Sequence, residues 1–144
     1  MTTQRTANVT WSGSLMDGNG TIESVDSGAF GPLDVTWASR TEDPRGLTSP
    51  EELIAAAHAA CFSMALSHGL AEAGTPPSRL DTSATVTFVP GTGITRIALV
   101  VRGSVPGIDA TGFGEAAAAA KEGCPVSKAL AAVPEITLEA SLAS

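Results

Sequence analysis

Two cysteines, Cys61 and Cys124, are the residues of this chain with the most distinctive chemistry. Cys61 lies in the alanine-rich stretch PEELIAAAHAACFSMALSHGL and Cys124 lies in KEGCPVSKAL. Four interpretations apply to such a pair. In the first, the thiols are unrelated buried residues; in the second, they form a structural disulfide, which a reducing cytosol disfavours. In the third they bind a metal, and in the fourth they perform redox catalysis as a thiolate and a resolving thiol.

The metal interpretation depends on the two histidines. His58, Cys61 and His68 fall on roughly one face of a helix, and Cys124 is a potential fourth ligand. However, the sequence contains no short metal-binding pair such as C-x-x-C or H-x-x-x-H. We therefore interpret both histidines as packing or surface residues and expect neither a metal nor an organic cofactor.

The redox interpretation makes different demands on the two thiols. Cys124 precedes Pro125 at a predicted helix start, where backbone N–H groups and the helix dipole stabilise a thiolate. Cys61 is predicted in the middle of a helix, where burial raises the pKa of a thiol, so a reactive Cys61 requires a nearby cation. Arg40 and Arg45 are the candidates just upstream, and Glu51 is placed to hold a guanidinium.

The helix that carries Cys61 has a well-marked start. Ser49 suits the N-cap, Pro50 the first helical position, and Glu52 the third position of a capping box, which leaves Glu51 without a structural task. The helix is predicted to end near Gly69 or Gly74. One apolar face is expected to contain these residues: Leu53, Ala56, Ala57, Ala60, Cys61 and Met64. Because the helix is apolar on nearly every side, we expect a homodimer to bury it.

Strands are predicted on both sides of this helix. Before it they cover residues 8–16, 21–25 and 33–39, with a polar loop over residues 40–50; after it they cover residues 83–89, 94–103 and 134–142. Short helices are predicted over residues 112–123 and from Cys124 to residue 132. This order lacks the regular alternation of parallel crossovers, so it predicts an α+β fold with largely antiparallel sheets.

The composition limits the classes of function. A chain of 144 residues fits a single domain, residues 1–144, and it is long enough for a core without metals or disulfides. The net charge of −7, with eight lysines and arginines scattered along the chain, predicts no nucleic-acid partner. We see neither a signal peptide nor a run of about 20 apolar residues, so we expect a cytoplasmic protein without membrane contact.

Three blocks of the sequence resemble a known family. TSPEELIAAAHAACFSMALSHGLAEAG, ITRIALVVRGSVPGIDA and KEGCPVSKAL are similar to the OsmC group of the OsmC and Ohr hydroperoxide reductases. The resemblance extends from WSGSL to the closing EITLEASL and includes both cysteines. The form GCPVS around Cys124 looks more like the OsmC branch than the organic hydroperoxide resistance branch.

The resemblance implies a cysteine-dependent peroxidase that is an intertwined homodimer, with sheets wrapped around two long central helices. It implies that Cys61 is the peroxidatic cysteine, Cys124 the resolving cysteine, Glu51 the glutamate of the P-E-x-L motif and Arg40 the arginine, with Arg45 as the alternative. Cys61 would become a sulfenic acid and then a disulfide with Cys124.

The implied substrates are organic hydroperoxides and, more weakly, hydrogen peroxide. The implied reductant is a dithiol, of which a lipoylated protein is one example. A redox sensor or a metal-binding module without sustained turnover is the alternative function, and steady-state kinetics or elemental analysis would distinguish these classes.

Overall fold

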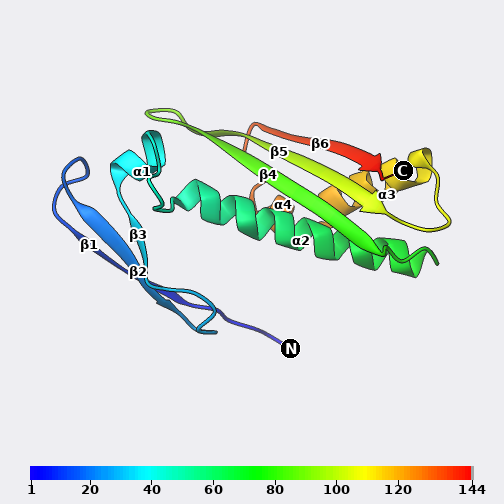
Figure 1. The fold of residues 1–144 in the computed structure, drawn as a ribbon, viewed down its shortest axis with the longest axis horizontal. Helices are drawn as coiled ribbons and strands as arrows, with labels where there is room; N and C mark the ends of the chain where they lie inside the picture. The colour runs from blue at the N-terminus through cyan, green and yellow to red at the C-terminus, as the bar shows by residue number, and fades with distance from the viewer. Residues whose placement is uncertain (144) are drawn as a thin grey trace. The chain divides into compact units, whose positions relative to one another are not determined.

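The computed structural model describes residues 1–143, and these form two compact units. The first unit comprises residues 1–53, and the second extends from Ile54 to the end of the described chain. The single domain predicted from chain length stays a prediction. The mixed α+β class is confirmed, because each unit contains a three-stranded sheet and at least part of a helix (Figure 1).

The first unit is built on a small antiparallel sheet in the order β1-β2-β3. Its strands are β1 (Ala7–Ser12), β2 (Asn19–Val25) and β3 (Leu33–Val35). The strand expected up to residue 39 ends earlier, because Thr36 caps a short helix, α1 (Trp37–Thr41). The Thr36 and Ser39 side chains each accept a hydrogen bond from the other residue's backbone N–H, which favours the helical turn over an extended chain.

Helix α2 (Pro50–Glu72) begins in the first unit and continues into the second. Ser49 is its N-cap, as predicted, since its hydroxyl accepts a hydrogen bond from the Glu52 backbone N–H at 3.2 Å. The predicted capping box is incomplete within residues 1–143, because the Glu52 carboxylate accepts no hydrogen bond from the Ser49 backbone N–H. It instead accepts a hydrogen bond from the Thr48 hydroxyl at 2.9 Å. The helix ends in a Schellman motif around Gly74, whose φ is +88°.

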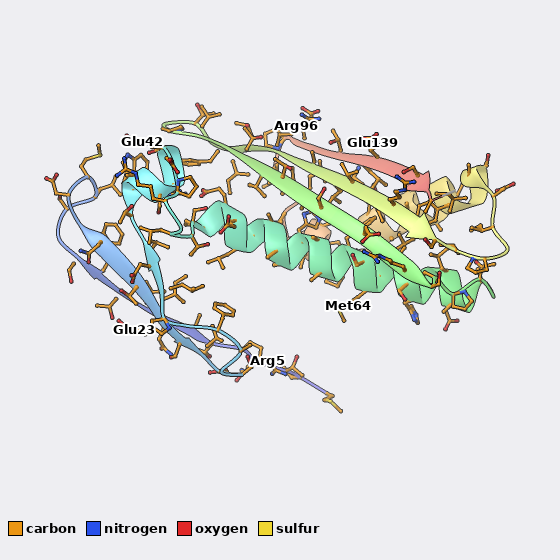
Figure 2. The ribbon with its side chains drawn as sticks, viewed as in Figure 1. Arg5, Glu23, Glu42, Met64, Arg96 and Glu139 are labelled. Atoms are coloured by element: carbon orange, nitrogen blue, oxygen red, sulfur yellow. The ribbon has the colours of Figure 1, made fainter. Side chains whose placement is uncertain are left out.

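The buried face of α2 differs from the predicted one. His58, Phe62, Leu66 and Leu70 are buried at steps of four residues. Most of the predicted face is exposed instead, and Met64 is 72% exposed with its side chain directed away from the sheet of the second unit (Figure 2). Three- and four-residue steps define several faces on so apolar a helix, and burial of the large Phe62 and Leu side chains decides among them.

The second unit is a three-stranded sheet with helices packed on one face. Its strands lie in the order β4 (Arg79–Val89), β5 (Gly93–Ser104) and β6 (Glu135–Leu142), and β4 is antiparallel to β5. The expectation of antiparallel sheets is wrong for β6, which pairs parallel to β5. A parallel pair needs a long crossover, and α3 (Ala110–Gly123) and α4 (Pro125–Ala129) provide it.

The core of the second unit lies between α2, the sheet and α3. Phe62, Leu66, Leu99 and Phe113 are each at most 1% exposed in this cluster, which also contains Cys124, with Cys61 packed against it. Within residues 1–143, α2 is also the one helix long and apolar enough to cross a membrane by length and composition. It contains no unbroken run of about 20 apolar residues, because His58, Ser63, Ser67 and His68 interrupt it. The core helix of a soluble protein passes the same test.

Candidate active site

The fold brings the two cysteines together although 62 intervening residues separate them in the chain. Cys61 lies in the middle of α2 and is partly buried, whereas Cys124 is fully buried at the junction of α3 and α4. Both are free thiols, and each side chain affects the pKa of the other, so the two thiols are neighbours in the fold. The pairing of the two thiols in one buried cluster agrees with the redox interpretation.

The position of Cys124 in the backbone makes it the more acidic thiol. It adopts an extended conformation with φ −62° and ψ 123° and serves as the N-cap of α4, with Pro125 next in the chain. Burial by itself raises the pKa of Cys124, but the backbone N–H groups of Ser127 and Val126, the Ser127 hydroxyl and the Cys61 thiol stabilise the thiolate. The net effect lowers the pKa of Cys124, as the sequence predicted for a helix start.

Cys61 shows the opposite behaviour. Burial is the largest cause and raises the pKa of Cys61, a backbone hydrogen bond from Val126 partly counters it, and the adjacent Cys124 raises it further. A pair of thiols this close shares one proton more readily than it loses both. Cys124 is therefore the more easily ionised thiol of the single chain, and a thiolate at Cys61 is favoured only with an additional positive charge.

Arg40 and Glu51 form an ion pair within the first unit. Arg40 lies in α1 and Glu51 in the first turn of α2. The Arg40 Nε donates to Glu51 Oε1 at 2.9 Å and to Oε2 at 3.1 Å, and Nη2 donates to Oε1 at 2.7 Å. Such a fork fixes the plane of the guanidinium. The Arg40 Cζ also lies 5.7 Å from the centre of the Trp37 ring, a cation–π distance.

The short helix α1 explains why Arg40 rather than Arg45 pairs with Glu51. Thr36 starts the helix and brings Arg40 into its last turn, beside the start of α2. Arg45 lies in the exposed turn that follows, with φ +50° and its backbone N–H bonded to the Asp43 carboxylate at 3.1 Å. The ion pair therefore favours Arg40 over Arg45 as the arginine that a carboxylate holds in place.

The histidines agree with the interpretation of packing and surface residues. His58 is fully buried, and His68 lies on an exposed part of α2. Within residues 1–143, no three side chains of the His, Cys, Asp and Glu types are placed to hold one metal ion. The metal-binding alternative thus has no geometric support in the described part of the chain.

The sequence reasoning missed a buried polar pair next to the two cysteines in the chain, His58 and Ser127. The His58 Nε2 and the Ser127 Oγ are 2.7 Å apart, and both side chains are buried. His58 precedes Cys61 by three residues and Ser127 follows Cys124 by three, so each lies one helical turn from a cysteine. This matched spacing was the available signal.

Comparisons with known proteins agree with these features. The family model described as OsmC-like protein matches residues 42–139. The protein named Peroxiredoxin OsmC of Escherichia coli (strain K12) is 46% identical over 147 residues, an alignment that covers 100% of both chains, and the protein of the same name from Shigella flexneri matches equally well.

Solved structures are similar over nearly the whole length. The OsmC-like protein of Mycoplasma pneumoniae has a TM-score of 0.70 at 16% identity and covers 96% of this chain and 98% of its own. The organic hydroperoxide resistance protein OhrB of Bacillus subtilis has a TM-score of 0.62 at 27% identity, with coverages of 96% and 98%. The match to the family model over residues 42–139 and the full-length relatives show that this chain belongs to the OsmC-like protein family.

Proposed function

We propose that the chain is a peroxidase that reduces organic hydroperoxides, and hydrogen peroxide more weakly, through Cys61 and Cys124. The observation that carries this proposal is the meeting of two free thiols of unequal acidity in one buried cluster. The family and the 46% identity to a protein named Peroxiredoxin OsmC support enzymatic activity of the peroxidase type. The chain is accordingly an oxidoreductase whose expected role is in oxidative stress.

In the first step, the Cys61 thiolate attacks the terminal oxygen of the hydroperoxide ROOH. A sulfur–oxygen bond forms, the O–O bond breaks, and the alkoxide that leaves takes a proton to become the alcohol ROH. The sulfur is oxidised by two electrons to a sulfenic acid, and the peroxide is reduced by the same two. The reaction uses no metal or organic cofactor.

Arg40 is the cation that we assign to this step. A guanidinium beside Cys61 would lower the pKa of the thiol, against the effect of burial, and would stabilise the negative charge on the departing oxygen. Glu51 is the positioning residue, because its fork with Arg40 holds the guanidinium in one orientation. Arg40 of the same chain or of a partner chain is the source of this charge in the proposal.

In the second step, Cys124 resolves the sulfenic acid. Its thiolate attacks the Cys61 sulfur, an S–S bond forms, and the hydroxide that leaves is protonated to water. An external dithiol then reduces the Cys61–Cys124 disulfide by thiol–disulfide exchange. A lipoylated protein is one dithiol of suitable chemistry. We place the enzyme in the cytoplasm, where reducing dithiols are kept available.

We also propose that the active form is an intertwined homodimer. The α2 residues Ala56, Ala57, Ala60 and Met64 form an exposed, uncharged face in the single chain. In the first unit, every residue of β1 is exposed, including Val9 at 59% and Trp11 at 41%. Helix–helix contact through the small side chains of α2 would bury the first of these surfaces, and a second copy would supply cover for β1.

Kinetics with an organic hydroperoxide test the proposed function. Wild-type protein supplied with cumene hydroperoxide and a dithiol should consume peroxide over many turnovers, and Cys61→Ser should lose this activity. Cys124→Ser should react once and then stall or overoxidise. An unchanged rate in Cys61→Ser would exclude the proposal, and a disulfide without sustained turnover in the wild type would favour a redox sensor.

A further inference from the structure

His58 and Ser127 form a buried polar pair to which the proposed reaction has so far given no task. The Nε2 and Oγ atoms are 2.7 Å apart, His58 is fully buried and Ser127 is 8% exposed. Replacing both partners of a buried hydrogen bond by apolar groups of the same shape can be nearly neutral or stabilising, so packing alone does not require this pair. The position of the pair, one helical turn from each cysteine, suggests a role in the reaction.

The protonation state of His58 follows from its surroundings. Burial lowers the pKa of His58, so the ring is neutral near neutral pH. The Nδ1 atom is buried and has no hydrogen-bond partner within residues 1–143. An unpaired buried N–H is rarer than an unpaired acceptor, which favours the tautomer with its hydrogen on Nε2. In that tautomer, Nε2–H donates to the Ser127 Oγ.

The direction of this hydrogen bond determines whether the Ser127 hydroxyl can donate to a second acceptor. A hydroxyl has one hydrogen to donate, and when its oxygen accepts from His58 that hydrogen is available to another acceptor. Ser127 is the third residue of α4, and Cys124 is the N-cap of the same helix. The backbone N–H and the hydroxyl of Ser127 lie near enough to the Cys124 sulfur to lower the pKa of Cys124. Within the described residues, the Cys124 side chain accepts no capping hydrogen bond.

We propose that His58 and Ser127 are positioning residues for the resolving cysteine: His58 orients the Ser127 hydroxyl, and the hydroxyl donates to the Cys124 sulfur. This inference rests on the proposed peroxidase function and assigns a task within its second step. The thiolate attacks the Cys61 sulfenic acid, the S–S bond forms, and the S–O bond breaks. The proton that Cys124 released earlier balances the departing hydroxide, giving water.

Substitutions at Ser127 can change its hydroxyl group without changing the charged side chains nearby. Ser127 lines a cavity of about 290 Å³ together with Lys121, Glu122 and Lys128, so a threonine methyl group has space. The charged groups that line this cavity with Ser127 are Lys121 and Glu122 of α3 and Lys128 of α4. On α2, His58 contacts Ser127 and Cys61 neighbours Cys124. Substitution of Ser127 or His58 leaves the charges of Lys121, Glu122 and Lys128 in place.

The test compares variants that remove the hydroxyl or its orienting partner with variants that keep them. Ser127→Ala removes the donor, and Ser127→Thr retains it. His58→Phe removes the ring N–H, and His58→Gln retains a donor near the Nε2 position. Ser63→Ala is the matched control, because the Ser63 hydroxyl is part-buried and donates to Thr82 Oγ1 at 2.7 Å.

Single-turnover oxidation by cumene hydroperoxide, quenched at intervals, gives the rate of disulfide formation. Loss of a hydrogen bond to a charged group corresponds to about tenfold less thiolate. The remaining thiolate is about threefold more nucleophilic, so resolution should slow by about threefold. Ser127→Ala and His58→Phe should show this delay, with sulfenic acid accumulating, while Ser127→Thr, His58→Gln and Ser63→Ala should resolve at the wild-type rate.

Thiolate absorbance provides a readout that does not depend on peroxidase turnover. In a Cys61→Ser background, Ser127→Ala should shift the titration of Cys124 to higher pH, whereas Ser127→Thr should leave it in place. Identical titrations for wild-type Ser127 and Ser127→Ala, or equal delays in the alanine and threonine variants, would overturn the inference. Absence of any Cys61–Cys124 disulfide in the wild type would instead refute the proposed function.

Discussion

Glu51→Gln is the substitution that tests the role of the Arg40–Glu51 ion pair. Three hydrogen bonds of 2.7–3.1 Å join the two side chains, and the Glu51 side chain is 8% exposed. Glutamine keeps the shape and one acceptor oxygen but removes the charge. Arg40 would then lose the group that fixes its guanidinium plane.

The expected cost follows from the burial of the two partners. Breaking a fully buried ion pair costs about 3–5 kcal/mol. The Arg40 side chain is 29% exposed and can be partly rehydrated, so we expect a loss of about 2 kcal/mol for Glu51→Gln. For a chain of 144 residues the melting temperature should fall by about 7 °C. A guanidinium displaced by about 1 Å should reduce kcat/KM for organic hydroperoxide by about 10- to 100-fold.

Glu52→Gln is the matched control, because it changes the neighbouring carboxylate by the same chemistry. Glu52 is exposed, and its carboxylate accepts a hydrogen bond from the Thr48 hydroxyl at 2.9 Å. Calorimetry and steady-state kinetics of both variants provide the assay. If Glu51→Gln and Glu52→Gln have the same melting temperature and the same kcat/KM, the reasoning about this pair is refuted.

Two further predictions concern charge and packing. In a variant whose single thiol is Cys61, Arg40→Met should raise the pKa of Cys61 and reduce its thiolate fraction near neutral pH by about tenfold or more. Arg45→Met should leave the thiolate absorbance titration of Cys61 unchanged. Equal titrations for the two variants would remove Arg40 from the site. Gly103→Ala should lower the melting temperature by an amount equivalent to about 1–3 kcal/mol, because the added Cβ would lie 2.6 Å from the ring of the buried Phe113. Gly114→Ala should not lower it, because the added Cβ would meet no described atom within 4 Å outside its own chain neighbours and local helix backbone. An unchanged melting temperature for Gly103→Ala would refute the close packing.

Local chemistry made several features predictable from the sequence. The start of α2 follows from Ser49 and Pro50, whose capping and backbone preferences act over a few residues. The ion pair was foreseeable because Glu51 had no capping task and a cation was needed nearby. The acidity of Cys124 was foreseeable because helix starts stabilise thiolates wherever the rest of the chain lies.

Features that depend on long-range packing were less predictable. The packing of Phe62 and Leu66 in the core determines which face of α2 is buried. Three- and four-residue steps do not identify this face, because the helix has apolar residues on most sides. Helix α1 replaces a predicted strand end because the Thr36 cap outweighs the β preference of Trp37. The parallel pairing of β6 depends on where the crossover returns the chain.

The His58–Ser127 hydrogen bond belongs to the same class of long-range feature. Its two residues are 69 positions apart, and their meeting depends on how α4 packs against α2. The three-residue offset of each from a cysteine becomes informative only once the cysteines are known to lie together. Sequence spacing alone placed His58 among packing residues, which is correct for its burial but leaves out its polar partner.

Mass spectrometry after one equivalent of organic hydroperoxide tests the central claim most directly. The account predicts that the peptides containing Cys61 and Cys124 become joined, with the loss of two hydrogens and without a linkage between other residues. Two unlinked peptides that carry unmodified thiols after the peroxide has been consumed would contradict it.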